Sequence, residues 1–301
     1  MRSVLTHPDK ICVLGERDLR AAGPGEARIR VRAFSLNRGE LRFATNKAEG
    51  SPIGWDLAGE LEDGTRVVGF SRRMEGWAEE VVLPEGDFAP LPEEVSFSQA
   101  CALPVAAGTA LACLDALGAN LLGHRVLVTG VTGGVGGFAV SLAREAGAEV
   151  TAQVRRESDI EYAKGLGAHR VVVTSDGAEL GSDASYRLVV DGIGGALLHG
   201  SLNALDPDGL AVSYGETGGQ KEALALASLY GKGRASLRGL NLYAVSDRVP
   251  PRDWLGRLVS LVAQGRLRPD LVERGSWTGI GEAAAALIHR KFRGKAVVFV
   301  D

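Results

Sequence analysis

Three glycines spaced three residues apart, Gly130, Gly133 and Gly136, form the part of this chain with the clearest chemistry. They follow an apolar β-branched run that starts at Val126, and a helical pattern continues after them. In such a turn the first glycine allows a tight bend, the second lets the backbone approach a pyrophosphate, and the third allows close helix packing. The helix N-terminus would stabilise the phosphates through unpaired N–H groups and the macrodipole. The spacing therefore predicts a dinucleotide-binding turn.

The residues after the next strand indicate which dinucleotide binds. A strand is expected over residues 149–154, and chains that use NAD usually carry an acidic residue just after it, for the ribose 2′-hydroxyl. Here Arg155 and Arg156 stand at that place. Guanidinium groups are always charged and make forked hydrogen bonds to phosphate oxygens, so the pair favours NADP(H) over NAD(H). The alternative is that both arginines only solvate the start of a helix.

Two further glycine groups, at residues 191–195 and 213–215, follow predicted strands of the same sheet. The carboxyl ends of such strands face the ligand crevice, although ordinary strand-to-helix turns have a similar composition. Asn241 follows the sixth predicted strand. The residues expected to bind the cofactor are Thr129, Gly130, Thr132, Gly133, Gly134, Val135, Gly136, Arg155, Arg156, Asp191, Gly192, Ile193, Tyr214, Gly215 and Asn241.

The elements that must position these residues follow three patterns along the chain. Residues 27–82 alternate short β-branched runs with glycine and proline, which is typical of strands and turns. An alanine- and leucine-rich segment follows, with Ser96 or Ser98 as the N-cap and Gly118 as the stop of one long helix. Strands and helices then alternate, which predicts a parallel doubly wound sheet. The closing strand, KAVVFV, is expected to return to the first domain.

Composition limits the class of protein. The chain has 301 residues, is 45% hydrophobic and carries a net charge of −3, with a pI of about 6.0. A nucleic-acid partner normally requires a basic surface, so none is expected. We expect no membrane span and no signal peptide, because no apolar run is long enough. Three cysteines without a CxxC pair fit a reducing compartment, so a cytoplasmic location is expected.

The ordered set of motifs resembles a known family, the zinc-independent medium-chain dehydrogenases and reductases, in the quinone oxidoreductase branch that includes zeta-crystallin. The matching segments are VRAFSLNRGEL, GWDLAGE, GWAEEVVLP, ALPVAAGTA, VTGVTGGVG, GLGAHRVV, VVDGIGG, QGRLRP and RGKAVVFV. The resemblance implies an α/β fold, with a mostly β, GroES-like substrate domain (1–105 and 242–301) and a Rossmann NADP(H)-binding domain (106–241). It also implies a homodimer.

The resemblance also implies that this chain lacks the metal ligands of its zinc-dependent relatives. A cysteine stands in those relatives at the position of Asn37, and a Gly-His-Glu motif at the positions of Gly54, Trp55 and Asp56. Tryptophan has no lone pair for Zn²⁺ and asparagine is a poor ligand, so no metal is expected.

Without a metal, hydride transfer from NADPH to a quinone or an α,β-unsaturated carbonyl is the expected reaction. By resemblance, Asn37 would face the nicotinamide or the substrate, and Thr109 would support the cofactor; local hydrogen bonding is the alternative for both. Asp56 could carry a proton, although water is the favoured source. The substrate pocket is expected to include Arg38, Arg42 and Trp55. The two arginines could instead be a solvated face of a short helix, and Trp55 a core residue.

Two other functions remain open from the sequence. An enoyl-type reductase of a biosynthetic pathway would use the same hydride step on an acyl or polyketide-like acceptor. A non-catalytic NADP(H)-binding sensor or regulatory protein would need no acid or base, and the sequence identifies none firmly.

Overall fold

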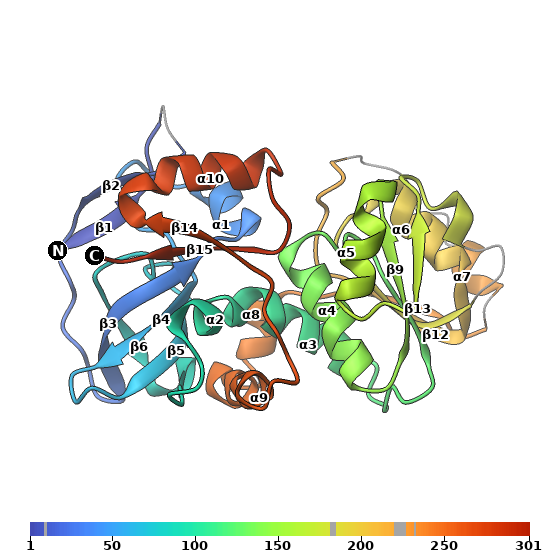
Figure 1. Cartoon of the computed structure of the whole chain (residues 1–301), viewed down its shortest axis with the longest axis horizontal. Coiled ribbons are helices and arrows are strands. Elements are labelled where there is room, and N and C mark those ends of the chain that lie inside the picture. The colour runs from blue at the N-terminus through green and yellow to red at the C-terminus, as the bar shows by residue number, and fades with distance from the viewer. Residues whose placement is uncertain (9–10, 181–184, 220–226, 232) are drawn as a thin grey trace. The chain divides into compact units, whose positions relative to one another are not determined.

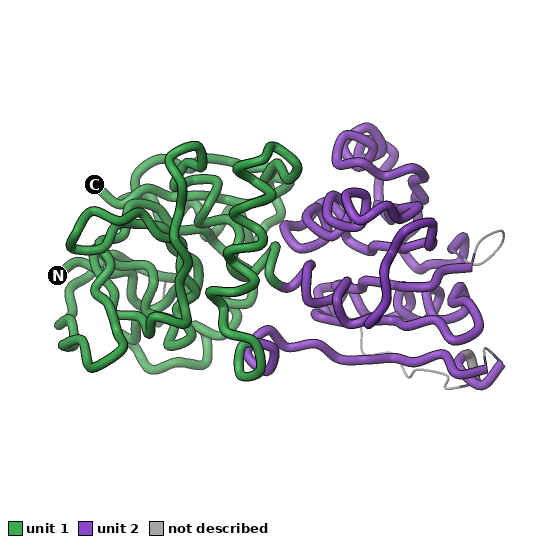
Figure 2. The backbone as a smooth tube through the Cα atoms, turned by 90° about the horizontal axis from the view of Figure 1, so that it is seen from below, with its two compact units in different colours: residues 1–108, 246–301 green, residues 109–245 purple. Residues whose placement is uncertain are grey.

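The computed structural model describes residues 1–8, 11–180, 185–219, 227–231 and 233–301. The chain forms two compact units (Figure 2). Unit 1 consists of residues 1–108 and 246–301, and unit 2 of residues 109–245. Unit 1 is therefore assembled from two segments that lie far apart in the sequence.

Unit 2 is built on a parallel sheet of six strands (Figure 1). Their order is β10-β9-β8-β11-β12-β13, and every pair in this order is parallel. The chain moves outward from β8 in one direction and then in the other, which confirms the expected doubly wound sheet. The strands are β8 (Arg125–Val128), β9 (Glu149–Val154), β10 (Arg170–Val173), β11 (Tyr186–Asp191), β12 (Leu205–Ser213) and β13 (Ser236–Gly239).

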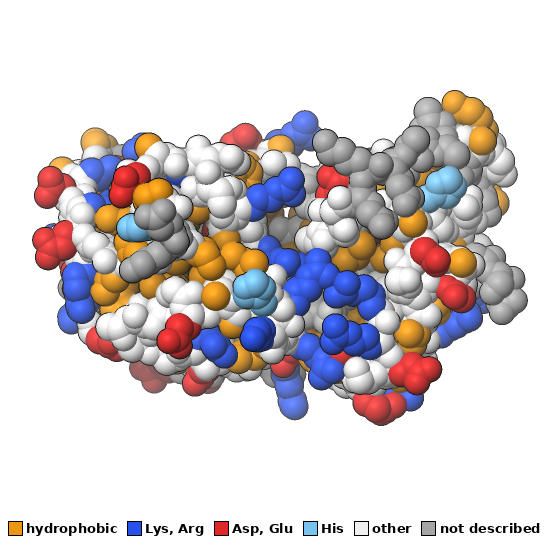
Figure 3. All heavy atoms as spheres, turned by 90° about the horizontal axis from the view of Figure 1, so that it is seen from above, with side chains coloured by type: hydrophobic (Ala, Val, Ile, Leu, Met, Phe, Trp, Pro, Cys, Tyr) orange, Lys and Arg blue, Asp and Glu red, His pale blue; other side chains and the backbone are white. Residues whose placement is uncertain are grey.

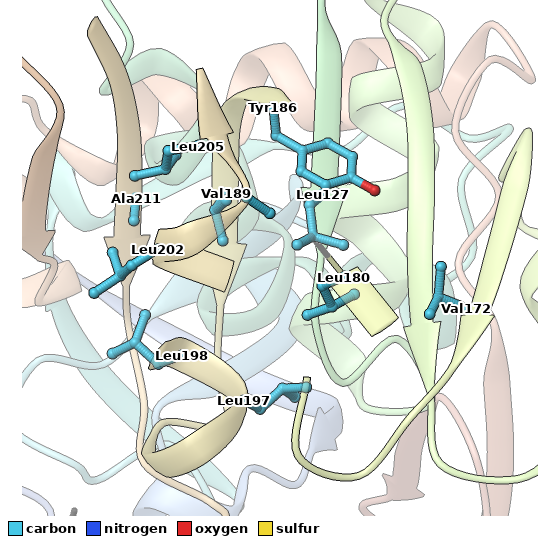
Figure 4. Packing of buried hydrophobic residues seen from close by; sticks show 11 residues of the cluster. Leu127, Val172, Leu180, Tyr186, Val189, Leu197, Leu198, Leu202, Leu205 and Ala211 are labelled. Carbon is cyan, nitrogen blue, oxygen red and sulfur yellow. The ribbon is translucent and has the colours of Figure 1, made fainter. Parts of the chain in front are cut away.

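Helices lie in most of the connections between these strands, as is usual for parallel pairing. They are α4 (Gly134–Glu145), α5 (Ile160–Gly165), α6 (Gly195–Asn203) and α7 (Ala227–Tyr230), with short 3₁₀ turns at Glu157–Asp159 and Ala178–Leu180. Apolar side chains from the sheet and from α6 pack together in the core cluster of Figure 4. Leu127 and Val189 of the two central strands are fully buried there. The β-branched and leucine-rich runs of the sequence thus become a sheet that is buried on its faces.

Unit 1 contains a mostly antiparallel sheet in the order β14-β15-β3-β4-β5-β7, with β6 also paired to β3. The closing strand β15 pairs with β3, with Val297 opposite Ser35, so the expected return of this strand to the first domain is confirmed. A separate hairpin-like sheet joins β1 and β2. The strands are β1 (Arg2–Leu5), β2 (Val13–Glu16), β3 (Glu26–Ser35), β4 (Asp56–Leu61), β5 (Arg66–Phe70), β6 (Glu80–Pro84), β7 (Phe88–Pro90), β14 (Leu271–Ser276) and β15 (Lys295–Phe299).

The helices of unit 1 pack around this sheet. They are α1 (Arg38–Ala44), α2 (Phe97–Cys101), α9 (Pro251–Ala263) and α10 (Ile280–Ile288), with 3₁₀ turns at Glu85–Asp87 and Trp277–Gly279. Two further helices, α3 (Gly108–Asp115) and α8 (Leu242–Ser246), lie where the chain passes from one unit to the other. In the part of the chain that the structure describes, no helix has the length and apolar character needed to cross a bilayer.

The long helix expected between residues 96 and 118 is divided into three parts. Ser96 caps α2, accepting a hydrogen bond from the Gln99 backbone N–H at 3.2 Å, as expected. A π-helical turn, Leu103–Ala107, then separates α2 from α3. Pro104 has no N–H to donate, and the next N–H, that of Val105, bonds to the Asp56 carboxylate at 2.9 Å instead of to a helix carbonyl. The sequence pattern showed the helix but not this break.

Candidate functional site

The glycine turn lies between β8 and α4, as the sequence predicted. Gly130 has a φ of +64°, a conformation that favours glycine. A Cβ on Gly136 would lie 2.5 Å from the Gly130 carbonyl oxygen and 2.8 Å from the Cα of Val131. Gly136 is therefore required for the start of α4 to pack on the loop that follows β8.

Gly133 differs from these two glycines, because nothing inside the protein requires it. Its φ is −91°, and a Cβ there would come no closer than 3.5 Å to any neighbour, which is an ordinary contact. Gly133 is also the N-cap of α4, and no side chain caps this helix. The open backbone N–H groups and the missing Cβ suit an approaching phosphate, so the residues present fit a dinucleotide.

A buried glutamine, which the sequence analysis did not identify, holds the turn in place. Gln153 of β9 accepts a hydrogen bond from the Gly130 N–H at 2.9 Å and donates to the Thr174 carbonyl at 2.5 Å. Its side chain is 1% exposed. A glutamine between Ala152 and Val154, near the end of a strand, was the signal that could have revealed it, because a buried amide needs partners.

Asp191 connects the carboxyl ends of three neighbouring strands, β8, β11 and β12. Its buried carboxylate accepts hydrogen bonds from Thr129 Oγ1 at 2.7 Å, from the Gly194 N–H at 3.0 Å and from Ser213 Oγ at 3.4 Å. Burial raises the pKa of Asp191, and these hydrogen bonds oppose the shift. Asp191 therefore holds neighbouring segments together at the carboxyl edge of the sheet.

The other predicted cofactor residues of unit 2 gather at the same edge. The Ile193 side chain lies against Gly130, and the Tyr214 ring lies against Gly192, where a Cβ would overlap it. Burial raises the pKa of Tyr214 well above its usual range. Asn241 lies beyond β13, where its side-chain oxygen accepts from the Tyr243 N–H at 2.9 Å. Its amide is thus partly used by the start of α8.

Arg155 and Arg156 follow β9 directly and are both exposed. Neither forms a salt bridge with any residue that the structure describes. Lys and Arg side chains gather on the face of the molecule that Figure 3 shows. The guanidinium groups of this pair are thus available for an anionic ligand at the end of β9.

Unit 1 holds a buried polar cluster around Asn37, Asp56 and Lys295. Asn37 Nδ2 donates to Asp56 Oδ2 at 2.7 Å, and Asn37 Oδ1 accepts from Lys295 Nζ at 2.6 Å. Lys295 also donates to Asp56 Oδ2 at 3.2 Å and to the Leu36 carbonyl at 2.9 Å. Asp56 is fully buried and Lys295 is 3% exposed. The cluster joins β4, β15 and the start of α1 through charged hydrogen bonds.

Asp56 has two more partners, Ser35 Oγ at 2.6 Å and the Val105 N–H at 2.9 Å. The role of Asp56 as a proton carrier stays a prediction. Its hydrogen bonds show that it joins β3, the start of α1, the π-helical turn and β15. Lys295 was missed by the sequence analysis. A lysine at the start of the apolar strand KAVVFV was the available signal, because an ammonium group there must find partners when it is buried.

A second buried carboxylate, Glu40, lies beside this cluster. It accepts hydrogen bonds from the Trp55 N–H at 2.6 Å and the Asn37 N–H at 2.7 Å, and it is fully buried. The pKa of Glu40 is raised to about 8, mainly by burial and secondly by the nearby Asp56 charge. Lys295 and the two backbone N–H groups oppose this shift.

The raised pKa of Glu40 predicts a specific pH dependence of stability. Between the ordinary value of 4.5 and the folded value of about 8, the folded state holds a proton that the unfolded state has lost. The contribution of Glu40 to the free energy of unfolding should therefore fall as pH rises through this window, by at most about 1.4 kcal/mol per pH unit. Urea titrations of the wild type and of Glu40→Gln should show a flatter pH profile in the variant. Parallel profiles would contradict the assignment.

The remaining predicted residues occupy different surroundings. Trp55 is buried at 6% exposure, with its ring edge-on to Phe43 at 5.8 Å. The short helix expected for Arg38 and Arg42 is confirmed as α1, where Arg38 donates to the Ile288 carbonyl at 3.2 Å and Arg42 is exposed. Thr109 is buried in the first turn of α3. Among the described residues, no three His, Cys, Asp or Glu side chains converge as a metal site would require.

Comparison with known proteins finds relatives of two kinds. Residues 134–263 match the zinc-binding dehydrogenase family. A quinone oxidoreductase of Pseudomonas aeruginosa is 26% identical over 309 residues, and the alignment covers 95% of each chain. A mycobacterial protein that was solved in complex with NADPH superposes with a TM-score of 0.87, covering 99% of this chain and 100% of that one. Its identity is 21%, so this likeness shows the fold.

A second kind of relative is a much larger protein. The spectinabilin polyketide synthase system protein NorB of Streptomyces orinoci is 30% identical over 263 residues, which is 82% of this chain. The chain spans about 12% of the length of NorB. The likeness therefore concerns one part of that protein.

Proposed function

We infer the activity of this chain from its family: it belongs to the medium-chain dehydrogenase/reductase family, in the quinone oxidoreductase branch, and is an oxidoreductase. We propose that it is an NADPH-dependent, zinc-independent reductase of quinones or α,β-unsaturated carbonyls. The observation that carries the proposal is the carboxyl edge of the unit 2 sheet. There, Gly133, which no contact inside the protein requires to be glycine, precedes α4, a helix that no side chain caps. Two exposed arginines follow the neighbouring strand β9.

The residues of unit 2 would divide the binding of the cofactor among them. Gly133 and the first turn of α4 would receive the pyrophosphate through backbone N–H groups. Arg155 and Arg156 would pair with the 2′-phosphate. Gln153 and Asp191 would act indirectly, because they fix the glycine turn and the loops beside it. When bound, the cofactor supplies a hydride from its reduced nicotinamide.

Asn37 is the residue proposed to act on the substrate. Its partly exposed amide would donate a hydrogen bond to the acceptor oxygen, on which negative charge develops. Water would then supply the proton, because the buried groups of the cluster are held by one another. The Lys295 ammonium group supplies positive charge beside Asn37, at the place where zinc-dependent relatives have metal ligands. This supports a reaction without zinc.

An enoyl-type reductase is the second candidate. The observation that favours it is the 30% identity with part of a polyketide synthase protein. Such an enzyme would reduce the alkene of an acyl thioester by the same hydride step, with the thioester oxygen in place of the quinone oxygen. The two candidates therefore differ in the acceptor and share the residues described above.

The test is NADPH oxidation by metal-free protein, with 1,4-naphthoquinone, an enone and crotonyl thioester as acceptors and NADH in parallel. We expect turnover with NADPH that survives chelation, and faster reduction of the quinone or the enone than of the thioester. Faster thioester reduction would favour the enoyl reductase. Stoichiometric zinc whose removal abolishes activity would refute zinc independence. Tight NADPH binding without turnover of any acceptor would favour a sensor.

We further propose that the protein is a cytoplasmic homodimer. The family resemblance suggests pairing through edge strands of the Rossmann sheet, and β13 lies at an edge of the described strand order. The mass from light scattering tests the dimer.

A further inference from the structure

We propose that Lys295 is a positioning residue for reduction. Together with Asp56, it fixes the Asn37 amide so that the free N–H of Asn37 can donate to the acceptor oxygen. This inference rests on the proposed function, in which Asn37 contacts the acceptor. It assigns a role to a residue from the last strand of unit 1, more than 250 positions from Asn37 in the sequence.

The orientation of the Asn37 amide is set by its two charged partners. An ammonium group can only donate hydrogen bonds, and Lys295 Nζ lies 2.6 Å from Asn37 Oδ1. A carboxylate can only accept them, and Asp56 Oδ2 lies 2.7 Å from Asn37 Nδ2. Turning the amide over would place its NH₂ group against the ammonium and its oxygen against the carboxylate. The two buried charges thus define one orientation.

One N–H of the Asn37 amide remains for a ligand. An amide nitrogen has two hydrogens, and Asn37 Nδ2 uses one of them for Asp56. The other meets no acceptor among the residues that the structure describes. Asn37 is partly exposed, whereas Lys295 and Asp56 are buried. Asn37 is therefore the member of the cluster that can present a donor to a ligand.

Lys295 also affects the strength of this donor. Lys295 has three N–H groups, and all three have acceptors: Asn37 Oδ1, Asp56 Oδ2 and the Leu36 carbonyl. A hydrogen bond from a cation to the amide oxygen draws electron density from the nitrogen, which makes the free N–H a better donor. This arrangement favours an acceptor oxygen that gains negative charge during the reaction.

A purely structural role makes a different prediction. Lys295 also ties β15 to the segment that follows β3, so its loss would lower stability whether or not Asn37 acts on the substrate. The two roles separate in a double-mutant cycle of Lys295→Met and Asn37→Ala. A positioning residue loses its effect on kcat once Asn37 is absent, whereas a structural effect does not depend on Asn37.

The measurement is kcat and KM for 1,4-naphthoquinone with NADPH, together with the melting temperature of each variant. We expect Lys295→Met to lower kcat about tenfold with a smaller change in KM, and to lower it no further in the Asn37→Ala background. Arg32→Met is the matched control, because it removes a partly exposed ion pair with Glu60 from the same sheet. It should leave kcat unchanged. Multiplying losses in the double variant would overturn the proposal.

Lys295→Met leaves the Asp56 charge buried without its cation, so that variant can fail to fold. Lys295→Met/Asp56→Asn removes both charges and keeps an oxygen that can accept from Asn37. We expect this pair of changes to restore the melting temperature but not kcat. Recovery of both would show that Lys295 acts through stability alone.

Binding of 4-nitrophenolate to cofactor-free protein tests the same donor without turnover. The phenolate oxygen imitates the charged acceptor oxygen, and we expect Lys295→Met and Asn37→Ala to weaken its binding equally. Equal affinity in wild type and Lys295→Met, or no binding to wild type, would overturn the inference. If wild type binds the phenolate and reduces none of the acceptors, the proposed function fails while the assignment of the donor stands.

Discussion

Replacing Arg155 and Arg156 together by alanine should weaken NADPH binding about 100-fold and change NADH binding by less than about threefold. The two cofactors differ only in the 2′-phosphate, so a selective loss locates that phosphate at the end of β9. Both arginines are exposed and form no salt bridge with a described residue, so their removal should cost little stability. Titration of the reduced nicotinamide fluorescence gives both dissociation constants.

Arg170→Ala is the control for this experiment. Arg170 is exposed and begins β10, the strand beside β9. Because the strands are parallel, it lies at the opposite edge of the sheet from Arg155. The control should bind both cofactors as the wild type does. Equal weakening of NADPH and NADH in the Arg155/Arg156 variant would show that the pair does not read the 2′-phosphate.

Gly136→Ala should lower the free energy of unfolding by about 3 kcal/mol, because the new methyl group has no space. It would lie 2.5 Å from the Gly130 carbonyl oxygen, so α4 or the turn must move. The same movement should weaken NADPH binding more than about tenfold, since the helix N-terminus is the expected phosphate site. Urea unfolding and fluorescence titration measure the two effects.

The next residue provides a matched control. Gly137 is also buried in α4, but a Cβ there would come no closer than 3.6 Å to its neighbours. Gly137→Ala should be neutral or more stable by up to about 1 kcal/mol, because alanine favours the helix. Similar losses in both variants would mean that helix packing, and not the approach to Gly130, determines the requirement.

The elements that sequence reasoning predicted well are those encoded locally. Strands β8 and β11 of unit 2 appear as apolar β-branched runs that lead into glycines, and the turn at Gly130 follows from the first of them. The predicted elements match the observed ones in type and order because the residues of each segment determine its local structure. The π-helical turn is different, because it depends on the Asp56 carboxylate, which lies 49 residues before Val105 in the chain.

The candidate site was predicted only in part, for the same reason. Asn37 and Asp56 were selected by their positions in motifs, but the sequence did not show that their side chains bind each other. Glu40 and Lys295 lie within matching segments, but nothing in those segments marks either residue for a role, and their importance comes from burial beside opposite or like charges. Such contacts join distant segments, and periodicity contains no information about them.

The pairing of β15 with β3 has a consequence for the order in which the molecule can form. During synthesis, the first 108 residues leave the ribosome long before β15 exists, and until then Asp56 lacks the cation that accompanies it in the folded protein. Unit 2 is one continuous segment and needs no later residues for its sheet. The middle of the chain can therefore fold while the first segment still lacks the strand that completes its sheet.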